Sequence, residues 1–425
     1  MKTAVIGAGW AGCAAAIEAT RLGQQVTLFE AGRIPGGRAR RVDGRWPDGS
    51  PLPLDNGQHI LIGAYSDTLQ LMAELGLDTS TLLLRMPLTL QFPDGTGLRF
   101  PRLPTPLDAL VGILRARGWS WGDRFSLLGA ALRWQMAGFQ CAPALSVAQL
   151  CQQLSQRVNA ELIEPLCVSA LNTPAERASA QVFLRVLHDA LFSQSGGSNL
   201  LLPRTDLSAL LPDAALAWLA QRGGDVRLST RVQALASTGT GWQVDGEVFD
   251  RVILACPPLE AARLASGSGL PCDAWVDQAR ALQFEAITTV YVLSPDTRLA
   301  QPMLALRASG PEGDAPAQFV FDRGQLGGPD GLLAFVVSAS QGDNTALAQR
   351  VLQQARQHLG LAQPVAVQTI VEKRATFACL PGLQRPAAQV LPGLLACGDF
   401  VAGPYPATLE GAVRSGLQVA RLAIK

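Results

Sequence analysis

The chain has 425 residues, of which 48% are hydrophobic and 16% are charged, and its formal net charge is +1. A disordered chain would show the opposite balance, and a near-neutral chain has no global field that attracts nucleic acid. The sequence contains no run of about 18 uncharged apolar residues, the length that a membrane-spanning helix needs. Its first residues do not resemble a secretory signal, so we expect a cytoplasmic protein. The length suggests two or three domains.

The eight cysteines and three histidines form no recognisable metal or hydrolase motif. No two cysteines are spaced C-x-x-C, and no histidine lies at zinc-finger spacing from them. The sequence also lacks a G-x-S-x-G element, which marks many serine hydrolases. We therefore predict reduced cysteines, no metal site, and an organic cofactor for any difficult chemistry.

The first thirty residues have the pattern of a βαβ unit. A short apolar run over Thr3–Ile6 precedes the glycine motif Gly7–Gly12, and an alanine-rich helical stretch follows to about Leu22. Gln25–Phe29 has the composition of a second strand, and Glu30 stands at its end. The sequence thus places G-x-G-x-x-G between a strand and a helix, which predicts a dinucleotide site.

Each residue type in this motif has a physical reason. Gly7 allows a tight turn, Gly9 lets the backbone approach a pyrophosphate, and Gly12 lets helix and strand pack closely. The helix N-terminus offers N–H groups to the phosphates, and Glu30 can accept hydrogen bonds from a ribose diol. The alternative, a glycine-rich turn in an ordinary α/β domain, leaves the acid at Glu30 unexplained.

A second glycine pair, Gly36-Gly37, is followed directly by Arg38. An NAD dehydrogenase would be expected to start its next helix soon after Glu30. A tight glycine loop that carries a cation is better suited to approach a diphosphate again, which favours FAD. The alternative is a solvated basic turn made of Arg38, Arg40 and Arg41.

The C-terminal region contains another candidate cofactor segment. Leu391–Asp399 is predicted to be a short buried strand that ends in Gly398 and Asp399, and a helix should begin near Thr408. Gly398 has no side chain to obstruct a cofactor, and Asp399 can accept a hydrogen bond from a ribityl hydroxyl. The helix would direct its N–H groups at the pyrimidine edge of a flavin, where reduction places negative charge.

These segments together resemble the flavin amine oxidase and phytoene desaturase superfamily. The resemblance is carried by GAGWAG with Glu30, by GGR at Gly36–Arg38, and by GDFVAGPYPATLEGAVRSG from Gly398. Gly223–Val232 resembles the strand whose backbone meets the adenine near Val232, and Phe249–Pro257 resembles the strand that follows it. The resemblance implies an α/β fold, with a Rossmann-type FAD-binding domain and a discontinuous α+β substrate domain.

The resemblance also implies how the cofactor is bound. No cysteine lies in residues 400–409, where some amine oxidases attach FAD, so we expect the FAD to be non-covalent. The predicted cofactor-binding residues are Gly7, Gly9, Trp10, Ala11, Gly12, Glu30, Ala31, Gly37, Arg38, Gln58, His59, Ile60, Val232, Gly398, Asp399, Thr408, Leu409 and Ala412.

Three further segments resemble the squalene-associated branch of the superfamily, the hydroxysqualene dehydroxylases. They are DNGQHILIGAY at Asp55–Tyr65, EKRATF at Glu372–Phe377 and YPATLEGA at Tyr405–Ala412. The branch implies an FAD-dependent oxidoreductase that reduces hydroxysqualene to squalene and water in the bacterial route to squalene and hopanoids.

This reaction needs an acid, because hydroxide is a poor leaving group unless it is protonated. The candidate catalytic residues are His59 and Tyr405. Alternatively, His59 is a hydrogen-bonded packing residue and Tyr405 is an aromatic wall of the pocket. Two other functions also remain open: oxidation of the carotenoid desaturase or amine oxidase type, and isoprenoid binding by an FAD-bearing protein without turnover.

The order of the motifs predicts a discontinuous domain arrangement. Residues 1–75, 200–265 and 385–425 would form the FAD-binding domain, and residues 76–199 and 266–384 the substrate-binding domain. The latter contains a helical region near 104–195. Strands are predicted at Ile287–Leu293, Gln318–Asp322, Leu332–Ala339 and Val365–Val371.

One stretch of the helical region, Arg115–Phe139, combines many aromatic and aliphatic side chains with flanking arginines. This composition suits a membrane interface, although a similar stripe also occurs in ordinary core helices. Because a C30 lipid substrate has to be collected from a bilayer, we expect membrane contact, on the inner face of the cytoplasmic membrane.

Overall fold

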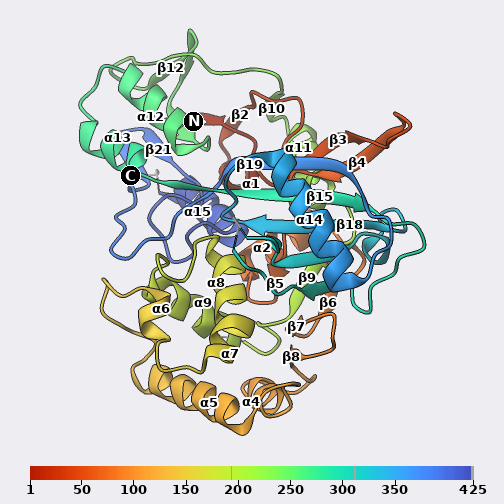
Figure 1. Cartoon of the computed structure of the whole chain (residues 1–425). Helices are drawn as coiled ribbons and strands as arrows, with labels where there is room; N and C mark the ends of the chain where they lie inside the picture. Colours follow the sequence, from red (N-terminus) through yellow and green to blue (C-terminus); the bar gives the residue numbers. More distant parts are fainter. Residues whose placement is uncertain (193, 311–312, 423–425) are drawn as a thin grey trace.

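The computed structural model describes residues 1–192, 194–310 and 313–422, and shows an α/β lobe, a second lobe built on an antiparallel sheet, and a layer of helices (Figure 1). The first lobe has a six-stranded sheet in the order β10-β2-β1-β14-β21-β20, parallel except for the edge strand β20. Its strands are β1 (Lys2–Ile6), β2 (Gln25–Phe29), β10 (Asp225–Arg227), β14 (Arg251–Leu254), β20 (Gln389–Leu391) and β21 (Leu394–Ala396). The predicted α/β fold class is confirmed.

The helix α1 (Trp10–Arg21) connects β1 to β2 in the predicted βαβ unit. It is buried almost all round, because α11 (Pro212–Gln221) and α15 (Leu409–Arg421) pack against it in addition to the sheet. The contact between α1 and α15 depends on small residues: a Cβ on Gly416 would lie 2.2 Å from the Ala11 carbonyl oxygen. The remaining helices of this lobe are α2 (Ser66–Glu74), α3 (Thr79–Leu82) and α10 (Leu207–Leu210).

The single strand expected near the C-terminus is instead a tight hairpin. β20 ends at Leu391 and β21 begins at Leu394, with an antiparallel register between them. The turn falls on Pro392 and Gly393, and Gly393 has a φ of +71°. Proline followed by a glycine in the left-handed region is turn chemistry, and it breaks the apolar run that suggested one strand.

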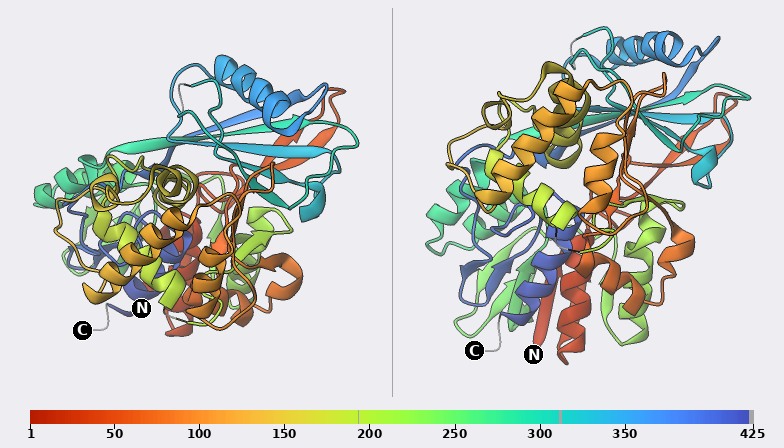
Figure 2. Two further views of the ribbon diagram at one scale, coloured as in Figure 1. Left: turned by 60° about the horizontal axis from the view of Figure 1, so that its bottom comes forward. Right: turned by 90° about the horizontal axis from the view of Figure 1, so that it is seen from below.

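The second lobe contains a five-stranded antiparallel sheet in the order β16-β17-β18-β15-β19. Each of the four runs predicted as strands lies in it. The helix α14 (Asn344–Leu359) packs on one face of the sheet, and the opposite face is turned toward the helical layer (Figure 2). The strands are β15 (Phe284–Leu293), β16 (Met303–Ala305), β17 (Phe319–Asp322), β18 (Leu332–Ser338) and β19 (Val365–Phe377), and a 3-10 turn covers Gly324–Leu326.

The predicted helical region forms the layer at the bottom of Figure 1. None of the helices in the described part of the chain is long and apolar enough to cross a membrane. The layer consists of α4 (Leu107–Leu114), α5 (Trp121–Met136), α6 (Val147–Leu150), α7 (Gln156–Val158), a π-helical turn (Asn159–Ile163), α8 (Glu164–Leu171) and α9 (Ala180–Phe192).

Small sheets and two further helices connect these parts. The elements are the hairpins β3 (Arg41–Arg45) with β4 (Pro51–Asp55) and β7 (Thr89–Gln91) with β8 (Gly97–Arg99), the sheet of β5 (Leu61–Ile62), β9 (Leu200–Pro203) and β6 (Leu83–Met86), the sheet of β11 (Leu235–Ser237), β12 (Trp242–Val244) and β13 (Glu247–Phe249), and the helices α12 (Pro258–Gly267) and α13 (Asp273–Arg280).

The domain division made from the sequence stays a prediction. Every strand of the six-stranded sheet falls within residues 1–75, 200–265 and 385–425, of which 423–425 lie outside the described residues. However, β9 pairs with both β5 and β6, and β6 lies beyond residue 75. This small sheet therefore joins the two predicted domains.

Candidate active site

A single cavity of about 1040 Å³ extends from the carboxyl ends of the parallel strands into the space between the five-stranded sheet and the helical layer. The carboxyl edge of a parallel sheet is where α/β folds bind their ligands. Every residue predicted to bind the cofactor or to act in catalysis lines this cavity, with the exception of Gly12.

The glycine motif forms the floor of one end. Gly7 has a φ of +112°, and a Cβ there would lie 2.5 Å from the Ala255 carbonyl oxygen. A Cβ on Gly12 would lie 1.8 Å from the Gly7 carbonyl oxygen, so Gly12 serves helix packing, as predicted. At Gly9 a Cβ would meet only the Gly37 Cα within 4 Å, because this position faces the cavity. The first N–H groups of α1 have no partner within their own helix, so they can bind a phosphate here.

Glu30 also lines the cavity, but its carboxylate has a structural task that the sequence did not indicate. Its two oxygens accept hydrogen bonds from the Ala8 N–H at 2.8 Å and from the Gly32 N–H at 2.7 Å. These bonds fix the glycine turn relative to the end of β2. Each carboxylate oxygen has a further lone pair, so the predicted contact with a ribose hydroxyl is compatible with them.

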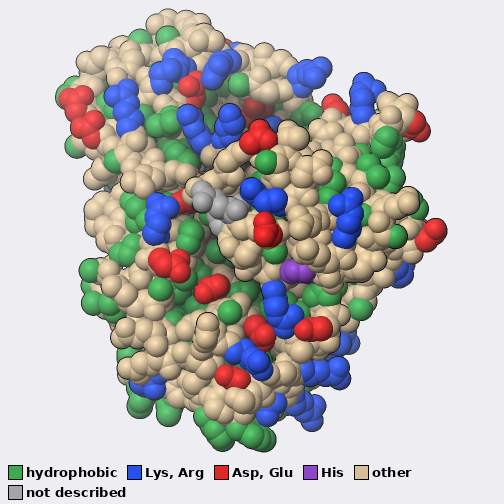
Figure 3. Space-filling model, viewed as in Figure 1, with side chains coloured by type: hydrophobic (Ala, Val, Ile, Leu, Met, Phe, Trp, Pro, Cys, Tyr) green, Lys and Arg blue, Asp and Glu red, His purple; other side chains and the backbone are tan. Residues whose placement is uncertain are grey.

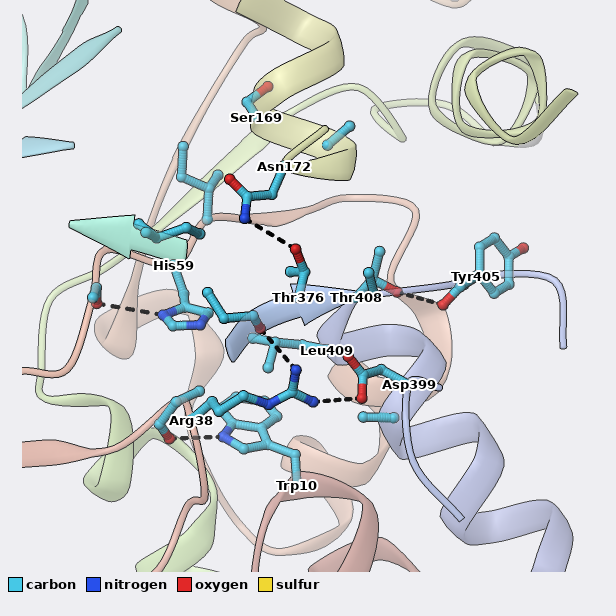
Figure 4. Close-up of a pocket in the computed structure, with 18 of the residues that line it drawn as sticks. Trp10, Arg38, His59, Ser169, Asn172, Thr376, Asp399, Tyr405, Thr408 and Leu409 are labelled. Atoms are coloured by element: carbon cyan, nitrogen blue, oxygen red, sulfur yellow. Dashed lines mark hydrogen bonds and ion pairs between the residues drawn. The ribbon is translucent and has the colours of Figure 1, made fainter. Parts of the chain in front are cut away.

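Arg38 and Asp399, which the sequence assigned to separate parts of the cofactor, form an ion pair. The Arg38 Nη2 lies 2.5 Å from the Asp399 Oδ1, and Nη1 donates to the Ala375 carbonyl oxygen at 2.7 Å (Figure 4). Burial opposes the charge of Arg38, but the Asp399 carboxylate raises its pKa above the usual value. The pair joins the Gly36–Arg38 loop to the end of β21 across the cavity.

The C-terminal helix begins as predicted, with Thr408 as its N-cap. The Thr408 hydroxyl accepts a hydrogen bond from the Gly411 N–H at 2.9 Å and donates one to the Tyr405 carbonyl oxygen. Glu410, which is fully buried, accepts bonds from the N–H groups of Asp67 and Thr68 at the start of α2. A carboxylate at a helix N-terminus is favourable, so Glu410 fixes the position of α15 at the cavity.

The predicted FAD site, which we call the cofactor cradle, ends at Val232, which is buried. Its carbonyl oxygen accepts a hydrogen bond from Arg263 at 3.0 Å, and Arg263 in turn pairs with Glu260 on α12 at 2.8 Å. The side chains of Arg231 and Glu260 line the cavity beside it. The backbone near Val232 is therefore held in place where the adenine is expected.

The DNGQHI segment places three predicted residues on the cavity wall. Gln58 is held by the Tyr291 hydroxyl at 2.9 Å and by Arg323 at 3.1 Å, and Ile60 lies beside it on the wall. The Nδ1 of His59 lies 3.4 Å from the Gly57 carbonyl oxygen. Burial lowers the pKa of His59 to about 4, so its imidazole is neutral at physiological pH.

Tyr405 lies on the other side of Thr408 from His59 (Figure 4). Its hydroxyl hydrogen-bonds the carboxylate of Asp189 on α9, which also accepts bonds from Arg185 and His188, both at 2.8 Å. Burial and the bond to Asp189 raise the pKa of Tyr405. Despite its burial, these three donors hold the pKa of Asp189 below its usual range, so it stays ionised. The two candidate acids are thus in different surroundings.

The far end of the cavity is apolar. Its walls come from the helical layer and from the inner face of the five-stranded sheet, and they include Phe100, Ile113, Leu127, Trp134, Phe183 and Phe321. The polar groups here are few and are bonded to one another: Asn172 donates to the Thr376 hydroxyl at 3.0 Å and accepts from the Ala339 N–H at 2.9 Å. Such a chamber suits a hydrocarbon.

The residues facing the cavity suit an organic cofactor, and comparisons with known proteins identify its kind. The family model for flavin containing amine oxidoreductases matches residues 10–424. The chain belongs to this family. It is therefore a flavin-dependent oxidoreductase.

Individual relatives and structures agree with this assignment. A hydroxysqualene dehydroxylase of Rhodopseudomonas palustris is 28% identical, with 99% of this chain and 97% of the relative covered. A 15-cis-phytoene desaturase of Synechococcus elongatus is 23% identical, with 100% and 96% covered. The solved structure of an oxidoreductase from Methanosarcina mazei has a TM-score of 0.74 at 17% identity and 99% coverage of both chains, and that of a putrescine oxidase has a TM-score of 0.66 at 18% identity, with 99% of this chain and 98% of the other covered. Together with the family match, they show an amine-oxidase-like FAD-binding fold.

Sequence reasoning missed the partners that hold these family residues in place. Asp189 on α9 and Asn172, directly after α8, lie outside any motif, and only the tertiary fold brings them to the cavity. Arg185, on the same helix as Asp189, donates to its carboxylate. Glu372 was within a quoted motif but had no predicted role; it accepts a hydrogen bond from Asn56 at 2.9 Å. Within the described ranges, no cluster of three or more His, Cys, Asp or Glu side chains could hold a metal ion.

Proposed function

We propose that this protein binds FAD non-covalently and reduces hydroxysqualene to squalene. The observation that carries the proposal is the shape of the cavity, which joins a dinucleotide cradle and an apolar chamber in one volume. A hydrocarbon in the chamber would meet the cofactor without leaving the protein. The similarity to hydroxysqualene dehydroxylases over the full chain supports this substrate class.

The residues of the cradle fit FAD. The Gly7–Gly12 turn with the start of α1 would hold the pyrophosphate, the backbone at Val232 the adenine, and the start of α15 the pyrimidine edge of the flavin. The basic side chains of Arg33, Arg40 and Arg231 also line this end and complement the charge of the diphosphate. Since residues 400–409 contain no cysteine, the proposed attachment is non-covalent.

The reaction replaces a C–O bond with a C–H bond and releases water, so it consumes one hydride and one proton. A reduced flavin supplies the hydride when it is bound. The protein has to exclude water around the reacting carbon and deliver the proton to the leaving hydroxyl. The apolar walls suit the first task, because a hydrocarbon packed against them displaces water from the reacting carbon.

Tyr405 is the better candidate for the proton donor. The Tyr405 phenol carries a proton at neutral pH, whereas His59, with a pKa of about 4, is not an imidazolium there. Because its raised pKa makes Tyr405 a weak acid, the assignment rests on that proton and on its position at the cavity. We expect Tyr405→Phe to lower kcat by about 10²–10⁴-fold, the usual contribution of a general acid, while His59→Ala retains turnover. Both variants must bind flavin in the normal amount for the comparison to hold. The opposite ranking would assign the proton to His59.

The function is tested by an anaerobic single-turnover assay. The purified protein, loaded with FAD and reduced chemically, is mixed with hydroxysqualene, and the products are separated by gas chromatography. We expect one squalene formed per flavin oxidised. If the flavin stays reduced and no squalene forms, the proposal is wrong.

Desaturation is the second candidate, because the phytoene desaturase relative also covers the full chain and the same chamber would accept a carotenoid precursor. Oxidised protein incubated with phytoene and a quinone separates the two reactions. Formation of a desaturated product there, without squalene in the first assay, would favour the desaturase. Isoprenoid bound without any product would favour a carrier.

A further inference from the structure

An unusual number of large apolar side chains is exposed on one surface of the helical layer. Of the fifteen exposed large hydrophobic residues in the described chain, eight fall between residues 103 and 136. The exposed fractions reach 61% for Trp121, 62% for Phe125 and 72% for Met136. Scattered single residues of this kind are ordinary, but a concentration on two neighbouring helices marks an interaction surface.

This surface, which we call the α4–α5 face, consists of Leu103, Leu107, Leu110 and Leu114 around α4 and of Trp121, Phe125, Leu132 and Met136 on α5. It lies at the end of the molecule farthest from the six-stranded sheet in Figure 1. In the space-filling view, hydrophobic side chains gather along the same lower edge, with Lys and Arg side chains beside them (Figure 3).

The exposed charges within residues 95–140, the segment that carries the face, have one sign. Between residues 95 and 140 the chain has six arginines, of which Arg99, Arg102, Arg115, Arg117 and Arg133 are exposed. Its two acids in this range are buried: Asp108 lies in the first turn of α4, and Asp123 belongs to the capping box of α5. The net charge of this segment is therefore +4, from six arginines and two aspartates, on a protein whose total is +1.

The arrangement of rings and cations suits the interface of a lipid bilayer. Arg124 lies over the Trp121 ring at 4.7 Å, and Trp121 stacks on Phe125 at 5.9 Å. Aromatic rings favour the headgroup level of a membrane, and arginines can extend from an apolar face to the phosphates. An anionic bilayer attracts each of these exposed arginines, whereas an uncharged soluble partner would gain nothing from them.

The same two helices connect the face with the cavity. While Leu110, Leu114, Phe125 and Leu132 point outward, Ile113 on α4 and Leu127 on α5 line the apolar chamber. One layer of helix thus separates the exposed face from the proposed substrate site. A hydrocarbon taken from a bilayer against this face would have to pass only this layer to reach the chamber.

From these observations we propose that the α4–α5 face docks on the surface of an anionic phospholipid bilayer and that the apolar substrate reaches the chamber from this side. The docking itself is independent of the reaction, and only the statement about the substrate rests on the proposed function. The apolar side chains of the face would insert into the membrane surface, and the exposed arginines would contact its phosphates.

The test of docking is flotation of the full-length flavoprotein with vesicles of phosphatidylcholine, with or without phosphatidylglycerol. We expect binding to the anionic vesicles that weakens at high salt. Trp121→Ser/Phe125→Ser/Met136→Ser should weaken it at least tenfold, and Arg115→Gln/Arg117→Gln/Arg133→Gln should remove most of the preference for phosphatidylglycerol. All six side chains are exposed, so the fold should tolerate the changes.

Matched controls come from exposed residues elsewhere. Val248→Ser/Leu270→Ser/Val365→Ser removes three exposed hydrophobic side chains, and Arg280→Gln/Arg298→Gln/Arg356→Gln removes three exposed arginines. Both controls should bind vesicles like the wild type. Docking is refuted if the wild type does not float with anionic vesicles, or if the serine triple variant floats equally well. It is also refuted if the wild type is a dimer that this variant dissociates, because the face would then bind a second copy.

The substrate route is tested by turnover. The serine triple variant should retain wild-type kcat with hydroxysqualene in detergent micelles and show a raised apparent KM with hydroxysqualene in anionic vesicles. Equal kinetics in both forms would refute the route even where docking holds. If no form of the protein makes squalene, the proposed function is wrong, and the flotation result still decides docking.

Discussion

The ion pair between Arg38 and Asp399 gives the most direct test of how the cofactor cradle is held together. Asp399 is almost buried, with 8% of its side chain exposed, whereas the Arg38 side chain is 35% exposed. A fully buried pair that loses one partner destabilises a protein by about 3–5 kcal/mol. Because Arg38 is partly solvated, we expect Arg38→Met to lower the free energy of unfolding by roughly 2–3 kcal/mol, including its lost bond to Ala375.

Asp399→Asn retains an acceptor oxygen and leaves a cation that water can reach, so it should cost less, about 1–2 kcal/mol. The double variant Arg38→Met/Asp399→Asn removes both charges. We therefore expect it to be more stable than the sum of the single changes predicts, by at least ~1 kcal/mol, which is the coupling energy of the pair.

The assay is urea unfolding of the flavin-free protein, followed by tryptophan fluorescence, together with titration of FAD into each folded variant. Both single variants should also bind FAD more weakly, because the pair fixes the Gly36–Arg38 loop relative to the end of β21. Additive changes in stability, within about 0.3–0.5 kcal/mol, would refute the coupling. Unchanged FAD affinity in both single variants would refute the positioning role.

Three further predictions concern buried charges. Glu410→Ala should lower the free energy of urea unfolding by about 3–4 kcal/mol, because three donors at the start of α2 lose an ionised acceptor. Glu410→Gln should cost roughly half as much. Equal losses in the two variants would exclude a role for the charge of Glu410. Arg251, which is 1% exposed, donates to the carbonyl oxygens of Val419 and Ala420 at the end of α15. Arg251→Met should cost about 2–4 kcal/mol because both carbonyls lose a charged donor and Val419 keeps only the bond from the Leu422 N–H at 3.3 Å; a loss under 1 kcal/mol would contradict this. Between pH 6.5 and pH 4 the unfolded chain binds a proton at His59 that the folded protein, with a pKa of about 4, does not, so His59 lowers the stability on acidification by up to about 3 kcal/mol. Buried Asp55, whose pKa is raised to about 6, acts in the opposite direction, so the effect of His59 is measured as the difference in stability between the wild type and His59→Gln at each pH; a difference that does not change with pH would contradict the assignment.

Local sequence patterns were sufficient to predict the parts of the fold that depend on residues close together in the chain. The βαβ unit could be predicted because β1, the glycine turn, α1 and β2 are consecutive, and each residue type is required by the local backbone. The start of a helix near Thr408 was predicted in the same way from a short motif, and the structure shows that Thr408 is its N-cap. The strand expected over Leu391–Asp399 was wrong in its first residues, because the apolar run was given more weight than the Pro392-Gly393 turn within it.

The candidate site needed contacts between residues far apart in the chain. Arg38 and Asp399 are each within a recognisable motif, but their pairing spans 361 positions and depends on how β21 lies beside β14. Likewise, the Tyr405 hydroxyl lies beside Asp189 because α9 lines the same cavity. No residue pattern near either position predicts this pairing.

By itself, then, the sequence indicated a flavin-dependent protein and predicted the glycines, acids and helix starts that line the cavity, since these patterns are local. The tertiary structure decided which charges neutralise each other, where the apolar chamber lies, and that the aromatic stretch of α5 faces outward on one side and the cavity on the other. Those properties depend on burial, and burial is set by the packing of segments that are distant in the sequence.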